Sequence, residues 1–212
     1  VVKEELAEMG AGGLLMEIAS RPLPRALAKS VNKREKKIMG VILAAGNSTR
    51  MGKDNKLLKN IDGAPLIRNT VIEMLKSDLE SCSIVLGYQS DKVAEVIKDL
   101  NINLILNPLW KEGQASSLKA ALNSLTSSYS DLLIMLGDLP GIKSDHINRI
   151  IEEHLSSENR RSKITIPSFK GEKGNPVIWG RSFFHDLSNL EGDVGGRALF
   201  GLHPVSYTHL TL

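Results

Sequence analysis

The sequence is poor in cysteine and in aromatic side chains, and it contains no long apolar run. Cys82 is the only cysteine among 212 residues, which excludes an internal disulfide framework and a zinc site built from several cysteines. Aromatic residues make up only 4% of the chain, a composition that suits an α/β protein with aliphatic strands. No stretch approaches the ~20 apolar residues of a transmembrane helix, and the N-terminus lacks the order of a signal peptide. We therefore expect a cytoplasmic protein without a membrane partner.

An excess of one charge is also missing from most of the chain. The formal net charge is +3, and residues 1–37 account for it with eight basic residues against five glutamates. The rest of the chain is formally neutral, whereas a nucleic-acid-binding domain is expected to carry a basic face on its folded body. We therefore expect no nucleic-acid partner, and we interpret the charged run at residues 33–37 as a solvated linker.

The chain is long enough for one domain of ordinary size with a substantial core. Residues 1–37, which are interrupted by Pro22 and Pro24, are interpreted as an N-terminal appendage or linker. From Ile38 onward, apolar runs alternate with helical patterns, which predicts an α/β fold with a mainly parallel sheet wrapped on both sides. The predicted strands are 38–43, 83–86, 102–106, 131–136, 163–167 and 176–179. The predicted helices are 64–76, 91–100, 116–125, 144–155 (with Ser144 as N-cap), 181–190 and 196–202.

The loop that follows the first predicted strand is the most informative segment. Small residues at positions 44–46 lead into a stretch with Ser48, Arg50 and Lys56. Glycine lets the main chain approach a ligand closely, and unpaired backbone N–H groups at such a turn favour anions, whose charge the cations neutralise. The loop therefore predicts a nucleoside triphosphate site.

Spacing separates this loop from two better-known phosphate loops. A P-loop needs four residues between its glycines and a hydroxyl after its lysine, but five residues separate Gly46 from Gly52 and Asp54 follows Lys53. A dinucleotide-binding loop needs a second glycine two positions after the first, where Ser48 stands. Taken alone, the segment also fits an ordinary strand-to-helix turn.

Two further loops are expected beside the first, because ligands in parallel sheets bind beyond the carboxyl ends of the strands. Asp138 follows the predicted strand 131–136 and suits a magnesium ion, which proteins hold through one or two carboxylates plus substrate phosphates. A turn aspartate that caps the next segment is the alternative. The loop Gly113–Ser117 offers small residues and hydroxyls to a base or ribose, although Ser116 or Ser117 would also serve as a simple helix cap.

Polar loops late in the chain supply candidates for substrate binding. Asn175 lies in a Gly-Asn-Pro turn, and Asp193 and Arg197 lie in a glycine-rich loop. Arg197 suits an anionic substrate, and a surface arginine beside a helix is the alternative. The five histidines show no metal-ligand spacing and are interpreted as surface or packing residues.

In order and spacing, these segments resemble the MobA-like NTP transferase family, and within it the molybdenum cofactor cytidylyltransferases (MocA-like). The resemblance covers about residues 38–200. It is carried by Leu43-Ala44-Ala45-Gly46 with Ser48, Arg50, Met51 and Gly52, by Lys56-Leu57-Leu58, by Gly113–Leu118, by Leu136–Pro140, by Gly174-Asn175-Pro176, and by Gly192-Asp193 with Gly195 and Arg197. The Leu-Ala-Ala-Gly form with Ser48 is similar to the cytidylyl branch, whereas guanylyl relatives more often show Leu-Ala-Gly-Gly.

The resemblance implies a Rossmann-like three-layer sandwich of the nucleotide-diphospho-sugar transferase type, with one antiparallel strand. It implies transfer of CMP from CTP to a molybdopterin-type cofactor with release of pyrophosphate, and a molybdoenzyme or its chaperone as a further partner. Lys56 and Arg50 would be catalytic and Asp138 would bind Mg²⁺. The nucleotide would be bound by Leu43, Ala44, Ala45, Gly46, Ser48, Lys56, Gly113, Ser116 and Ser117. The acceptor substrate would be bound by Asn175, Asp193 and Arg197.

One departure from the family concerns the end of the chain. The family continues into a segment with Asp-x-Asp-Thr-Pro, which residues 205–212 do not contain. We therefore expect a nucleotidyltransferase domain at residues 38–204 followed by an atypical tail without the family's C-terminal element. Two alternatives stay open: guanylyl or other nucleotidyl transfer to a phosphorylated small molecule, and a catalytically impaired nucleotide-binding module.

Overall fold

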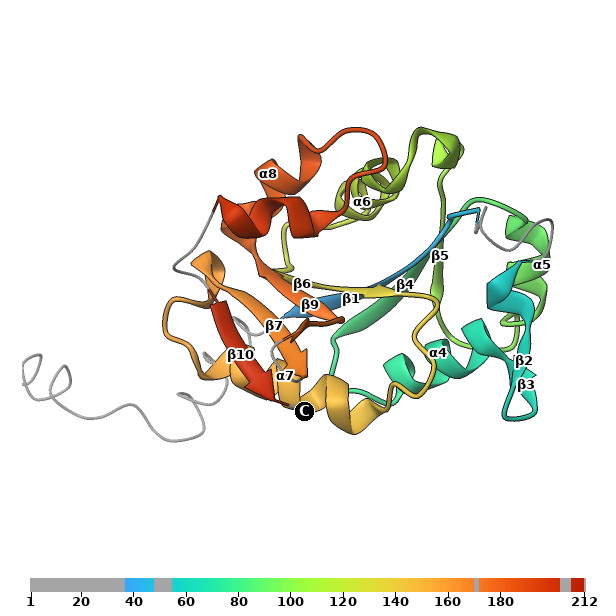
Figure 1. Ribbon diagram of the computed structural model, residues 1–212, viewed down its shortest axis with the longest axis horizontal. Coiled ribbons are helices and arrows are strands. Elements are labelled where there is room, and N and C mark those ends of the chain that lie inside the picture. Colours follow the sequence, from blue (N-terminus) through green and yellow to red (C-terminus); the bar gives the residue numbers. More distant parts are fainter. Residues whose placement is uncertain (1–36, 48–54, 170–171, 203–206, 212) are drawn as a thin grey trace, which may run out of the picture. The chain divides into compact units, whose positions relative to one another are not determined.

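A mainly parallel, eight-stranded sheet carries the fold (Figure 1). The computed structural model describes residues 37–47, 55–169, 172–202 and 207–211, all within the unit formed by residues 36–212. The strand order is β10-β7-β9-β6-β1-β4-β5, and β8 pairs with β7. The bounds are β1 Ile38–Ala44, β4 Ser81–Leu86, β5 Asn103–Leu106, β6 Asp131–Leu136, β7 Ile164–Phe169, β8 Glu172–Lys173, β9 Val177–Gly180 and β10 Tyr207–Thr211.

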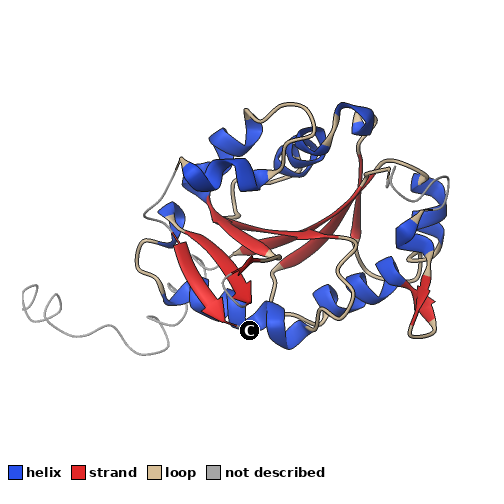
Figure 2. Cartoon of the chain, in the orientation of Figure 1, coloured by secondary structure: helices blue, strands red, loops and turns tan. Residues whose placement is uncertain are grey.

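Helices cover the sheet on both faces (Figure 2). The first face packs against α4 (Leu66–Leu75), α5 (Ser90–Glu95) and α7 (Ser144–Ser156). The second face packs against α6 (Gln114–Asn123) and α8 (Phe184–Ser188). This arrangement confirms the predicted three-layer α/β sandwich.

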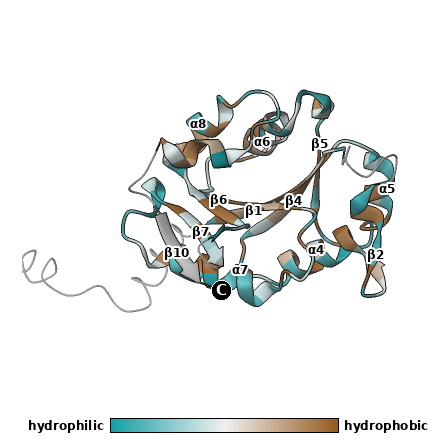
Figure 3. Ribbon diagram, in the orientation of Figure 1, coloured by the Kyte–Doolittle hydropathy of each residue, from teal (hydrophilic) through white to brown (hydrophobic). Residues whose placement is uncertain are grey.

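The central strands are apolar because both of their faces are covered. All seven residues of β1 are buried. Its successive side chains enter opposite layers, with Val41 in one hydrophobic cluster and Ile42 in the other. Hydrophobic colouring accordingly concentrates on the middle strands (Figure 3). The alignment of β1 with β6, in which Leu43 is opposite Leu136, brings the loops after both strands to the same edge.

Strand direction also agrees with the prediction, with one addition. β9 runs antiparallel to both β6 and β7, as the single antiparallel strand of the prediction does. The short strand β8 is a second antiparallel strand that was not predicted. The tail contributes β10, which pairs in parallel with β7 from Tyr207 opposite Ile164 to Thr211 opposite Ser168. No strand was predicted there.

Several predicted helices begin or end at other residues in the structure. The helix predicted at 116–125 is α6, which runs from Gln114 to Asn123, and the helix predicted at 144–155 is α7, which ends at Ser156. The helix predicted at 64–76 begins at Leu66, because Ala64–Pro65 form β3, which pairs with β2 (Asn60–Ile61). The helix predicted at 91–100 stops at Glu95, where Arg68 donates a hydrogen bond to the Val96 carbonyl and so satisfies an acceptor that a further helical turn would use.

Three further predictions about helices are corrected. Ser144 is not the N-cap of α7, because the cap position is Lys143 and the Ser144 N–H donates to Glu73. The helix predicted at 181–190 is a 3₁₀ turn (Arg181–Phe183) followed by the short α8, and that at 196–202 is 3₁₀ throughout Gly196–Gly201. In the described parts of the chain, no helix combines the length and apolarity that a membrane crossing needs.

Candidate functional site

A cavity of about 790 Å³ opens at the carboxyl ends of the parallel strands. Its walls come from the ends of β1 and β6 with the loops that follow them (residues 43–47 and 136–138), from residues 110–114 after β5, and from Leu57, Ser117 and Asp193. The volume lies within the ~300–1,000 Å³ that is usual for small-molecule sites. The structure thus brings together the three loops that the rule for parallel sheets predicted.

The loop after β1 is built from small residues that leave the backbone close to the cavity. Leu43, Ala44, Ala45 and Gly46 all line it. Ala45 is buried and its carbonyl accepts the Tyr88 N–H, whereas a Cβ added at Gly46 would meet no atom of the described residues within 4 Å. This geometry fixes the strand end and leaves the next peptide unit accessible to a ligand.

Lys56 and Asp138 form an ion pair at the cavity. Lys56 Nζ lies 3.2 Å from Asp138 Oδ2, and the side chains are 39% and 41% exposed. Lys56 is fixed at the start of a 3₁₀ turn (η2, Lys56–Leu58), where the Asn55 side chain accepts the Leu57 N–H. Asp138 is fixed by Gly137, whose N–H donates to the Leu43 carbonyl. A cation and a carboxylate therefore stand together beside the loop after β1.

Asp138 fits a divalent cation only in one mode of binding. Among the residues that the structure describes, no three His, Cys, Asp or Glu side chains are grouped as a metal site. Magnesium, however, is often bound by one or two carboxylates, with water and substrate phosphates completing the shell. A half-exposed carboxylate beside the loop after β1 suits that mode.

A buried asparagine organises the loop after β5. Asn107 is 3% exposed, and its amide donates to Ser116 Oγ (2.9 Å) and Ser117 Oγ (3.2 Å) while its carbonyl oxygen accepts the Leu109 N–H. Ser117 lines the cavity, but the Ser116 hydroxyl donates to the Gly113 carbonyl and lies outside the lining. Sequence reasoning missed Asn107, although an asparagine before a proline at a strand end is a turn signal.

The loop at residues 192–193 holds the N-terminus of α6, a contact that we call the α6 clasp. Asp193 Oδ1 accepts the Gln114 N–H at 3.3 Å, and the Gly192 carbonyl accepts the Ala115 N–H at 3.1 Å. Gly113 sits in the left-handed region at φ 101°, and a Cβ there would come within 2.5 Å of Asp193 N. The structure thus places Asp193 in the cavity wall as a helix cap that reaches across 79 residues.

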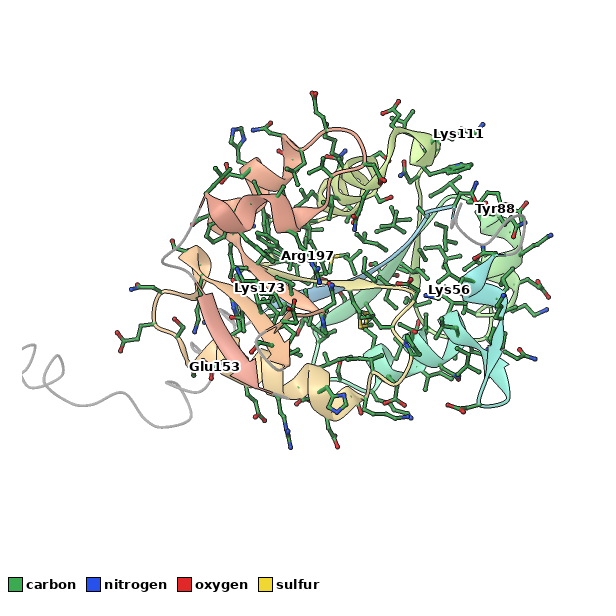
Figure 4. All side chains as sticks on the ribbon, in the orientation of Figure 1. Lys56, Tyr88, Lys111, Glu153, Lys173 and Arg197 are labelled. Carbon is green, nitrogen blue, oxygen red and sulfur yellow. The ribbon has the colours of Figure 1, made fainter. Side chains whose placement is uncertain are left out.

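The other two predicted substrate residues lie outside the cavity lining. Arg197 donates to the Lys173 carbonyl at 3.0 Å, and Figure 4 shows the two side chains together, away from Lys56. Asn175 precedes Pro176 across a cis peptide bond. Ser48 and Arg50 lie outside the described residues.

Comparisons with known proteins show which protein family has similar sequences. A sequence model of the MobA-like NTP transferase domain matches residues 40–207. The bifunctional protein GlmU of Prochlorococcus marinus (strain MIT 9211) is 28% identical over 153 residues, which are 71% of this chain and 32% of that protein. The chain therefore spans about a third of that curated relative.

Solved structures share the fold. Rv0371c from Mycobacterium tuberculosis H37Rv superposes with a TM-score of 0.71 at 25% identity, covering 84% of this chain and 90% of that one. The same protein in complex with manganese superposes with a TM-score of 0.66 at 22% identity, covering 83% of this chain and 89% of that one. A CMP:2-keto-3-deoxy-manno-octonic acid synthetase complexed with CTP superposes with a TM-score of 0.64 at 12% identity, covering 83% of this chain and 90% of that one. This likeness confirms the predicted fold class.

Proposed function

Since this chain belongs to the MobA-like NTP transferase family, we propose that it is a Mg²⁺-dependent nucleotidyltransferase that moves CMP from CTP to a molybdopterin-type cofactor. The observation that carries the proposal is that Asp138 and residues 43–46 line one cavity, while Lys56, itself outside the lining, is ion-paired with Asp138. A triphosphate needs backbone donors, a cation and a carboxylate that can share a metal ion, and this arrangement supplies all three.

In the proposed reaction, an oxygen of the acceptor's terminal phosphate bonds to the α-phosphorus of CTP. The bond from the α-phosphorus to the oxygen that bridges it to the β-phosphorus breaks, and pyrophosphate leaves with that oxygen and its electron pair. The acceptor phosphate is already ionised near neutral pH, so no protein nucleophile or strong base is needed. Lys56 stabilises charge on the phosphates, and the backbone of residues 44–46 positions them. When bound at Asp138, Mg²⁺ would neutralise charge on the triphosphate.

The choice of CTP and of a divalent metal has separate support. The Leu-Ala-Ala-Gly segment at residues 43–46 resembles the cytidylyl branch of the family. A protein of the same fold is known in complex with CTP, and Rv0371c is known in complex with manganese. Both observations concern those proteins and supply the ligands to test first.

Pyrophosphate release tests the proposal directly. The chain is incubated with Mg²⁺, with CTP, GTP, ATP or UTP in turn, and with molybdopterin as acceptor. We expect release with CTP that depends on the acceptor. A clear preference for GTP would overturn the nucleotide assignment and favour guanylyl transfer. Tight NTP binding without any pyrophosphate release, whatever the acceptor, would favour a nucleotide-binding module.

A further inference from the structure

The proposed function leaves open which group of the cavity receives the ring of the bound nucleotide, and the following inference rests on that function. Asp138 follows β6 and Trp110 follows β5, and β1 and β4 lie between those strands. Three strand spacings of about 4.8 Å separate the two loops by roughly 14 Å. A nucleotide whose phosphates lie at Lys56 and Asp138 would therefore extend its base toward the loop after β5.

Trp110 is held firmly at that end of the cavity. It begins the 3₁₀ turn η3 (Trp110–Glu112), and its carbonyl accepts the Gly113 N–H. Gly87 brings Trp110 next to the loop after β1, because a Cβ at Gly87 would lie 2.5 Å from Trp110 Cβ and 2.8 Å from Ala45 Cβ. The indole is thus fixed beside the residues proposed to bind the nucleotide.

The surroundings of Trp110 suit a planar ring. Among the described residues that line the cavity, Trp110 is the only aromatic one, and it is half-buried. Its ring centroid lies 5.4 Å from that of Tyr88 at a 56° tilt. Lys111 Nζ lies over the indole ring, 5.6 Å from the indole centroid. Figure 4 shows Tyr88 and Lys111 on the same side of the molecule. The tilted Tyr88 ring restrains the indole, so little rotamer freedom would be lost when a ligand stacks on it.

We propose that Trp110 is a specificity-determining residue that stacks on the heteroaromatic ring of the bound nucleotide. Stacking on an aromatic side chain tolerates every base, because each base has a π-face. Trp110 would therefore select nucleotides over phosphate compounds without a ring, while polar neighbours such as Gln114 would read the edge of the base. A pterin ring offers the same chemistry, so the test separates the two sources.

Calorimetry on two substitutions measures the stacking. Trp110→Leu keeps an apolar side chain without a π-face, and Trp110→Phe keeps the π-face. With Mg²⁺ present, we expect Trp110→Leu to bind CTP about 5- to 100-fold more weakly than the unsubstituted chain, and Trp110→Phe to retain most of the affinity. Inorganic tripolyphosphate, which has no ring, should bind all three proteins equally.

Fluorescence identifies the ring that stacks. The chain has two tryptophans, and Trp179 is 2% exposed in the core, so Trp179→Phe leaves Trp110 as the sole indole reporter. We expect CTP to quench this signal and tripolyphosphate not to. Quenching by a pterin but not by CTP would overturn the assignment to the nucleotide. If Trp179→Phe does not fold, the calorimetric comparison decides alone.

The outcomes distinguish this inference from its premise. If the unsubstituted chain binds no NTP, the proposed function and the inference both fail. If it binds CTP and a folded Trp110→Leu binds CTP equally well, the inference fails and the proposed function stands. If Trp110→Leu loses tripolyphosphate as well as CTP, the indole has a packing role only, and the inference fails.

Discussion

Lys56 and Asp138 meet at the cavity although 82 positions separate them in the chain. Because each side chain is about two-fifths exposed, solvent screens the pair, and such pairs contribute only about 0–1 kcal/mol to folding. The pair is therefore poorly suited to a structural role and well placed to exchange partners when an anion or a metal ion enters. We therefore expect changes to this pair to alter ligand binding and turnover more than folding stability.

We expect Lys56→Ala to lower the rate of pyrophosphate release by about 10²–10³, which is the usual effect of removing one preorganised donor to a reacting group. The free energy of unfolding should change by less than about 1 kcal/mol. Turnover is measured with CTP and acceptor, and stability by urea titration. Lys59→Ala is the matched control, because Lys59 is three positions away with an exposed side chain. Near-normal turnover of Lys56→Ala would contradict the role given to Lys56.

Asp131 contrasts with the half-exposed Lys56–Asp138 pair, because its carboxylate is completely buried at the start of β6. Its Oδ2 accepts hydrogen bonds from Ser130 Oγ at 2.6 Å and Arg160 Nε at 3.2 Å, and its Oδ1 lies 3.3 Å from His154 Nε2. Burial raises the pKa of Asp131, but the neighbouring His154 ring, the hydrogen bond from Ser130 and the charge of Arg160 outweigh burial and leave the pKa below its ordinary value.

This lowered pKa makes stability depend on pH in the acid range. A carboxyl group with a depressed folded-state pKa stabilises fully above its unfolded value of ~3.9, and the contribution is lost as pH falls through the folded value. We expect Asp131→Asn to lower the free energy of unfolding at pH 7 by about 3–5 kcal/mol, since it breaks a buried charged network. Urea titrations at pH 7, 5 and 3 should show this deficit shrinking only in the most acidic sample. Asp145→Asn, at an exposed position on α7, is the control. A deficit that is the same at all three pH values would refute the assignment.

At the scale of elements, the α6 clasp joins two segments of the site into one unit. Residues 192–193 satisfy the N–H groups of Gln114 and Ala115, which the first turn of α6 cannot satisfy itself. Gly113 is required for the close approach, because its φ is positive and the neighbouring backbone leaves no room for a Cβ. The wall that contains Trp110 and Gln114 therefore depends on a loop 79 positions later in the chain.

Alanine substitutions at two glycines distinguish the effect of a steric clash with neighbouring backbone from the effect of backbone strain alone. Gly113 and Gly141 both have positive φ, 101° and 81°, but a Cβ at Gly141 would meet nothing within 4 Å. We expect Gly141→Ala to cost only the conformational strain of about 1–2 kcal/mol. Gly113→Ala should cost more and should also weaken CTP binding, because it pushes the clasp apart. The measurements are thermal unfolding and calorimetry on both variants. Equal losses of stability with unchanged CTP affinity would show that the clasp does not support the site.

The elements that the sequence predicted well are those whose residues are uniform in chemistry. The strand 131–136 was predicted with the bounds that the structure shows, because a short apolar run between turn residues has the length of a buried strand and is too short for a typical helix. Strands β2, β3 and β8 are only two residues long and were not predicted, although the Asp62-Gly63 turn between β2 and β3 is a hairpin signal. Helix α5 ends early because Arg68 takes the Val96 carbonyl, a contact across 28 positions.

The residues of the candidate site likewise fall into those that the sequence predicted and those that it did not. Residues 43–46 and Asp138 were predicted to lie together because strand ends gather at one edge of a parallel sheet, and the structure gathers them. The partner of Asp193 depends on how two separate loops pack, and the partners of Asn107 depend on how the β5–α6 connection folds back on itself, neither of which spacing along the chain specifies. Trp110 was not singled out, since a tryptophan in a loop has the same sequence signature whether it faces the core or a cavity.

At the scale of the whole molecule, the candidate binding cavity and the buried Asp131 network lie at opposite ends of the sheet's strands. The cavity lies at the carboxyl ends of β1, β5 and β6, whereas the Asp131 network lies at the amino end of β6. β10 forms an edge of the sheet, at one end of the strand order, while β5 forms the other. Among the described residues that line the cavity, none belongs to β7 or β10. Changes at that edge should therefore alter folding without altering the site.

A variant that ends at Leu202 tests this separation. It removes β10, whose five residues pair with β7, and so leaves β7 with an unpaired edge. Each ladder hydrogen bond contributes about 0.5–1.5 kcal/mol, and the cost of ordering the strand offsets much of the sum, so we expect a loss of about 1–3 kcal/mol in the free energy of unfolding. CTP affinity, measured by calorimetry at a temperature where both proteins are folded, should be unchanged. Lys56→Ala is the reciprocal control, with altered turnover and retained stability. If the shortened chain is folded but has lost CTP affinity, the β10 edge is coupled to the cavity, and the separation argued here is wrong.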